Sequence, residues 1–131
     1  MEISTTATTA TRAAIEMHWK LGNERKWQEF AQLLATDLQY HTPQTRERIQ
    51  SGAGYLDMFV TWPGDWQAEI EELICEQFKA VCRIKFSIGG ESMTGISFFT
   101  LSAQGKIESV TEYWPESYEP PARVSKHMIR Y

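Results

Sequence analysis

The sequence predicts an α+β fold in which helices precede a sheet. The first half of the 131-residue chain carries apolar residues at helical spacing. From residue 66 onward, four runs alternate apolar and polar residues and are separated by short turns. A meander of strands that follows a group of helices belongs to the α+β class. If the sheet is strongly bent, a cavity forms between it and the helices.

The first predicted helix covers residues 5–21 and ends at Gly22-Asn23, a pair typical of a helix C-cap. Its charged residues fall on one narrow stripe: Arg12, Glu16 and Lys20. Apolar side chains occupy the rest of the circumference, which indicates a helix largely covered by other elements. His18 lies near the middle of this apolar arc.

The remaining elements follow from spacing and from breakers such as Pro43. They are a helix at 24–35, a strand at 37–42, a loop at 44–50, a helix from Ser51-Gly52 to Val60, a turn at 62–65, and strands at 66–76, 78–88, 92–103 and 106–114. We expect one domain over residues 1–131, with a core of about 8–115 and a tail at 116–131.

Composition and charge exclude several classes of function. The net charge of −4 and the pI near 5.4 argue against a nucleic-acid partner. No apolar run is long enough to span a membrane, and the first residues lack the basic start and apolar region of a secretory signal. Cys75 and Cys82 are too few for a disulfide framework, so we expect buried thiols in a reducing cytoplasm.

The last strand contains the most informative residue. Side chains alternate along a strand, so Val110, Glu112 and Trp114 share one face. If that face is buried, the carboxyl group of Glu112 must be paired, protonated or used in chemistry. If the face is open, Glu112 is a solvated charge. The alternation by itself leaves both alternatives open.

Four stretches together resemble the nuclear transport factor 2-like superfamily, and within it the bacterial SnoaL-like branch, which is polyketide cyclase-like. They are Asn23 to Trp27, Ala35 to Pro43, Gly54 to Phe59, and Gly105 to Pro115. The resemblance implies a cystatin-like conical barrel, in which three N-terminal helices cover a strongly curved, mainly antiparallel sheet. It also implies a pocket between helix and sheet, and a homodimer. Family members include cofactor-independent isomerases, cyclases, dehydratases and epoxide hydrolases, and also non-catalytic binders.

The resemblance also implies site residues. In isomerase members the base precedes the proline that ends the first strand; Thr42 holds that position, with His41 before it, and threonine is no base at neutral pH. A tyrosine donor of the same enzymes corresponds to His18. A pocket carboxylate of the hydrolase members corresponds to Glu112, just before Tyr113-Trp114. Glu112, His18 and His41 are therefore the catalytic candidates.

The expected lining is mostly aromatic. Because Tyr40 and Thr42 point opposite to His41 along a strand, only one of these sets can face the pocket, and the sequence leaves the choice open. The aromatic candidates are Trp19, Tyr55, Phe59, Trp62, Trp66, Phe99 and Trp114. Such walls favour a small, flat, apolar or aromatic ligand. Three scattered histidines and the lack of a glycine-rich phosphate loop predict no metal and no cofactor.

The sequence leaves two candidate functions. The first is a SnoaL-like cyclase, isomerase or dehydratase in which Glu112 and His18 transfer a proton. The second is a non-catalytic ligand-binding or dimeric assembly module, which the threonine at position 42 favours.

Overall fold

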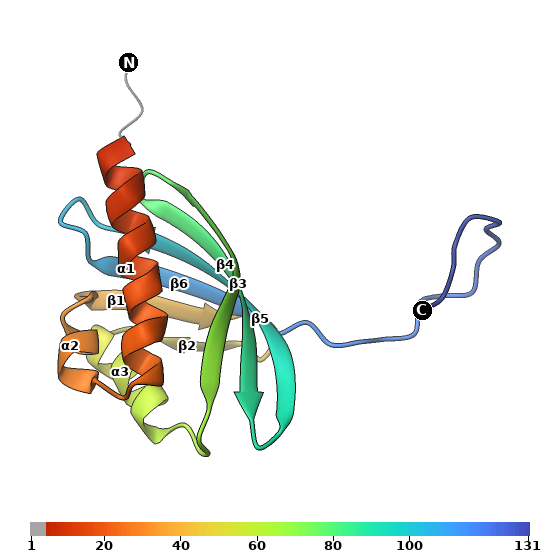
Figure 1. Cartoon of the computed structure of the whole chain (residues 1–131), viewed down its shortest axis with the longest axis horizontal. Helices are drawn as coiled ribbons and strands as arrows, with labels where there is room; N and C mark the ends of the chain where they lie inside the picture. Colours follow the sequence, from red (N-terminus) through yellow and green to blue (C-terminus); the bar gives the residue numbers. More distant parts are fainter. Residues whose placement is uncertain (1–4) are drawn as a thin grey trace.

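The three helices precede the last four strands, as predicted. The computed structural model describes residues 5–131 (Figure 1). Its elements are α1 (Thr5–Asn23), α2 (Trp27–Ala31), β1 (Leu34–Thr42), β2 (Glu47–Ile49), α3 (Gly52–Thr61), β3 (Gln67–Glu76), β4 (Lys79–Ile88), β5 (Glu91–Leu101) and β6 (Ile107–Tyr113). The expected α+β class is therefore confirmed.

The strands form one curved sheet in the order β2-β1-β6-β5-β4-β3. All neighbours are antiparallel except β1 and β6, which are parallel. Irregularities in three of the ladders, such as the one between Ile70 and Glu72, accompany the bend of the sheet. The sheet does not close, and α1 crosses its concave side in Figure 1.

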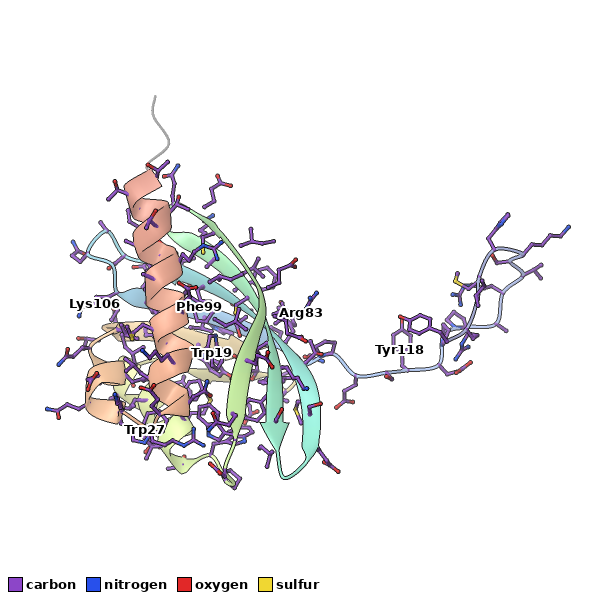
Figure 2. All side chains as sticks on the ribbon, viewed as in Figure 1. Trp19, Trp27, Arg83, Phe99, Lys106 and Tyr118 are labelled. Carbon is purple, nitrogen blue, oxygen red and sulfur yellow. The ribbon has the colours of Figure 1, made fainter. Side chains whose placement is uncertain are left out.

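The core fills the space between the helices and the concave face. In β4, Cys82, Ile84 and Phe86 are buried there, while Arg83 and Lys85 point outward, as the alternation predicts. Figure 2 shows Trp19 of α1 and Phe99 of β5 within this layer. Burial of each such large side chain stabilises the fold by about 1.5–3 kcal/mol.

The apolar arc of α1 is narrower than predicted. Ala13 and Met17 are exposed, because α1 lies across the sheet as an outer element and is covered on one side only. Ile15, His18 and Trp19 form its buried side.

Two segments differ from the sequence prediction. The helix expected at 24–35 is only Trp27–Ala31: Arg25 has a positive φ of 59°, and Leu34 already pairs with Ile107 of β6. The segment expected as a loop at 44–50 contains β2, which pairs with β1 through Arg48 and His41. The first difference reflects pairing of β1 with the distant strand β6, and the second reflects pairing of β2 with β1. Local propensity does not encode such pairing.

Residues 116–131 contain no helix or strand, and they run away from the sheet in Figure 1. Tyr118 of this tail is highly exposed, and Arg130 pairs with Glu119 within it. No helix in residues 5–131 is long and apolar enough to cross a membrane.

Candidate functional site

A cavity of about 210 Å³ opens between α3 and the concave face of the sheet. Its apolar walls are Met58, Phe59, Trp62, Trp66, Phe86 and Trp114. Its polar lining is Tyr40, Thr42, Gln44, Thr45, Glu47, Glu112 and Glu116. An apolar protein cavity of about 150 Å³ accepts benzene, so this volume suits a molecule of one or two rings.

Glu112 is the buried acid of this cavity. Its position on β6 between Val110 and Trp114 turns it to the concave face, where it is 3% exposed. Its Oε1 accepts hydrogen bonds from Tyr40 Oη at 2.9 Å and Trp114 Nε1 at 3.2 Å, and its Oε2 accepts one from Ser97 Oγ at 2.8 Å. Burial raises the pKa of the carboxyl group, while the three hydrogen bonds act in the opposite direction.

Tyr40 reaches Glu112 because β1 and β6 are parallel neighbours. Tyr40 pairs with Val110, two residues before Glu112, so its hydroxyl comes beside the carboxyl group. Burial and the neighbouring Glu112 raise the pKa of the Tyr40 hydroxyl, which keeps it a hydrogen-bond donor. The arrangement holds Glu112 in one orientation toward the cavity.

The choice between the two faces of β1 is made by the tertiary structure. Tyr40 and Thr42 line the cavity, and the Thr42 hydroxyl bonds to that of Thr45 at 2.7 Å. His41 lies on the opposite face, exposed, beside Thr111 of β6 and Arg48 of β2. The structure therefore does not bring His41 to the cavity.

His18 is fully buried, but it lies in the core and does not line the cavity. Its Nε2 shares a 2.7 Å hydrogen bond with Tyr55 Oη, and its Nδ1 has no partner in the described chain. Burial lowers the pKa of His18 to about 3, so its ring is neutral at pH 7. None of the hydrogen bonds of His18 or Glu112 among the described residues joins one to the other. Tyr55 packs against the rings of both His18 and Tyr40.

The aromatic candidates divide into two layers. Phe59, Trp62, Trp66 and Trp114 line the cavity. Trp19, Tyr55 and Phe99 are core residues outside it. The division depends on how α1 and α3 sit on the sheet, because all of these residues lie on apolar faces of their own elements.

Several residues that line the cavity or bond to Glu112 were not predicted. Ser97 is a polar residue between Gly95 and Phe99 on the inward face of β5, and that alternation is a signal that could have found it. Gln44 is placed by its side chain, which bonds to both backbone groups of Trp114. Glu47 lies on β2, so it could not be found while that segment was expected to be a loop. In residues 5–131, no group of three or more His, Cys, Asp or Glu is arranged to hold a metal ion.

Known proteins resemble this chain in sequence and fold. A candidate ketosteroid isomerase from Kribbella flavida is 37% identical, with a TM-score of 0.88 over 95% of this chain and 91% of that one. An LEH-like epoxide hydrolase from M. tuberculosis is 16% identical, with a TM-score of 0.70 over 82% and 84%. A candidate polyketide cyclase from Sinorhizobium meliloti is 21% identical, with a TM-score of 0.66 over 76% and 93%. No curated protein matches the chain significantly.

The last two proteins show a shared fold alone, because their identity is low. The first is similar enough to indicate common ancestry along nearly the whole chain. The model of the SnoaL-like domain matches residues 4–110, which include the helices and the strands up to the middle of β6. The protein therefore belongs to the SnoaL-like domain family, within the nuclear transport factor 2-like fold.

Proposed function

We propose that this protein is a cofactor-independent enzyme that moves a proton within a small apolar molecule, as an isomerase, cyclase or dehydratase does. One observation carries the proposal: Glu112 is almost fully buried, yet it lines an aromatic cavity. A carboxyl group whose pKa is raised by burial is suited to general acid–base catalysis near neutral pH.

We assign the proton transfer to Glu112 alone. The ionised carboxylate takes a proton from a carbon beside a carbonyl group, and the resulting acid returns it to another atom of the same molecule. His18 has no part in this transfer, because burial keeps it neutral and its hydrogen bond goes to Tyr55. The similarity to a candidate ketosteroid isomerase supports the isomerase form of this chemistry.

The proposal is tested by the exchange of α-protons for deuterium in 2-tetralone, a two-ring ketone that suits the cavity. In deuterated buffer, NMR should show exchange faster than with an equal concentration of acetate. Glu112→Gln should reduce the protein-dependent rate at least 100-fold. Glu108→Gln, which removes an exposed carboxylate of the same strand, is the matched control. Equal exchange by wild type and Glu112→Gln would exclude Glu112 as the base.

A non-catalytic ligand-binding module is the second candidate function. It is favoured by the three hydrogen bonds that already satisfy much of the Glu112 carboxyl group within the protein. A protein that binds 2-tetralone in calorimetry without accelerating its exchange would be such a module.

We also propose that the protein forms a homodimer through the outer face of the sheet. Aligned residues of neighbouring strands place apolar side chains together there, and we call them the outer patch: Ile74, Val81, Ile96, Phe98 and Tyr113. Phe98 is 49% exposed and its ring contacts that of Tyr113. A second copy would remove this apolar area from water.

A cytoplasmic location is the remaining proposal. Cys75 and Cys82 are both free thiols, and the register of β3 and β4 aligns Cys75 with Ala80 and Cys82 with Leu73. Free thiols suit a reducing compartment. Localisation of a tagged full-length chain by cell fractionation tests it.

A further inference from the structure

The charges around the cavity all have one sign. Glu47, Glu112 and Glu116 line it, and none of the lining residues in the described chain is Lys, Arg or His. The carboxylates of Glu47 and Glu116 form no hydrogen bond or ion pair with the described residues. The cavity therefore presents uncompensated negative charge at its entrance and a buried acid inside it.

Arg25 is a basic residue that contacts a wall of the cavity, but its guanidinium group is bound elsewhere. The guanidinium group of Arg25 lies 4.2 Å from the centre of the Trp66 ring, but Arg25 does not line the cavity. It donates to the backbone carbonyls of Gly22 and Trp66 and lies 3.4 Å from Asp65. These partners occupy Arg25 outside the cavity.

The aromatic walls also favour a positively charged ligand. The faces of aromatic rings attract cations, most strongly for tryptophan. Trp62, Trp66 and Trp114 all line the cavity, and Trp114 Nε1 donates to Glu112, so ring and carboxyl group are adjacent. A cation in the cavity would therefore have Glu112 and three tryptophan side chains among its neighbours.

The hydrogen-bonding groups of the cavity favour a ligand that donates hydrogen bonds over one that accepts them. A carboxylate offers about four acceptor positions, and protein donors fill three at Glu112, which leaves one on Oε2. The polar hydrogens of Tyr40 and Trp114 point to Glu112, and Gln44 is bonded at both ends to the backbone of Trp114. An anionic ligand would meet the carboxylates of Glu47 and Glu116 and the buried acid Glu112.

We propose that the cavity binds a protonated amine carried on an apolar skeleton of one or two rings, with the ammonium group directed to Glu112. This inference rests on the proposed function only in taking the cavity to be the ligand site. It adds the charge of the ligand, which the fold does not determine.

Three probes of the same ring system and different charge test it: 2-naphthylmethylamine, 2-naphthylmethanol and 2-naphthoate. At pH 7, calorimetry should show the amine binding at least 10-fold more tightly than the alcohol, and no binding of the naphthoate. Glu112→Gln should reduce amine affinity at least 10-fold and leave alcohol affinity within about 2-fold. Glu108→Gln should change neither, which separates the cavity acid from the overall negative charge of the protein.

The outcomes distinguish the charge preference of the cavity from the proposed enzyme function. Equal binding of amine and alcohol to the wild-type protein overturns the charge preference and leaves the proposed enzyme function standing. A preference for the amine that survives Glu112→Gln overturns the contact with Glu112. Tight amine binding without exchange of 2-tetralone supports the inference and contradicts the enzyme function. Failure of all three probes to bind overturns the inference and the cavity as a site for ligands of this size.

Discussion

The hydroxyl group of Tyr40 donates a 2.9 Å hydrogen bond to Oε1 of Glu112, although the two residues lie 72 positions apart in the chain. Their strands, β1 and β6, are parallel neighbours, so the contact is set by the register of the sheet. It is one of three hydrogen bonds that favour the ionised form of an acid whose burial favours the neutral form. The balance between these effects determines when Glu112 can act as a base.

Tyr40→Phe should raise the pKa of Glu112. The substitution removes a donor to the carboxylate while the burial remains, and a hydrogen bond to a charged group contributes about 1.5–3 kcal/mol. We therefore expect an upward shift of the Glu112 pKa. The measurement is a carbon NMR titration of labelled glutamate side chains, with Glu112→Gln used to assign the signal. Tyr113→Phe, on the outer face, should leave the pKa unchanged. An unchanged pKa in Tyr40→Phe would show that this hydrogen bond has no influence.

His18 should make the protein less stable in mild acid. Its pKa is about 3 when folded, against an ordinary value of 6.5, so the unfolded chain binds a proton below pH 6.5 and the folded one does not. The contribution of neutral His18 is fully present above pH 6.5 and falls by up to about 1.4 kcal/mol per pH unit below it. Between pH 7.5 and 5.0, we expect about 2 kcal/mol of loss in the free energy of unfolding.

Urea denaturation at these two pH values measures this loss. His18→Gln should lack it, whatever the variant loses at both pH values through packing. Glu112 has the opposite effect on the free energy of unfolding, because a buried carboxyl group with a raised pKa destabilises the fold less as the pH falls. It is present in both proteins, so its effect cancels when wild type and His18→Gln are compared. His41→Gln, at an exposed histidine, should behave as wild type. A His18→Gln variant with the wild-type pH dependence would contradict the prediction.

Gly95→Ala should displace the Trp114 wall of the cavity. A Cβ atom at position 95 would lie 2.8 Å from Cζ3 and 2.9 Å from Cη2 of Trp114, and 3.1 Å from Cγ1 of Ile84. Overpacking of this kind costs about 1–3 kcal/mol of stability, which urea denaturation measures. Because Trp114 supplies the clash, the cost of Gly95→Ala should be smaller in a Trp114→Phe background. Simple addition of the two losses would indicate that the methyl group fits without moving the ring.

Phe98→Asp should convert the proposed dimer into a monomer. The substitution places a charge in the outer patch, opposite Val81 and Thr111, where it remains solvated in a monomer and would be buried in a dimer. Sedimentation equilibrium should show twice the chain mass for the wild type and one chain mass for the variant. Gln104→Asp adds the same charge at the exposed β5–β6 turn and should remain dimeric. A wild-type protein that sediments as a monomer would remove the dimer proposal.

The order of the helices and strands, apart from β2, and the inward face of the late strands could be predicted from the sequence. Both are local properties, because the period of a pattern reports which side chains of one element share a face. Alternation therefore placed Glu112 with Val110 and Trp114, and the turns bounded β4 and β5 closely. The family followed from stretches of sequence whose order and spacing suit one fold.

The contacts of Glu112, in contrast, depend on how distant segments pack together. Whether Tyr40 or His41 faced inward depended on the parallel pairing of β1 with β6, a contact between distant segments. His18 was correctly placed on the buried side of α1, but the packing of α3 gave it Tyr55 as a partner and left it in the core. The sequence could thus name the buried acid, and the assembled sheet and helices decided its three donors, because those contacts join residues that no local pattern connects.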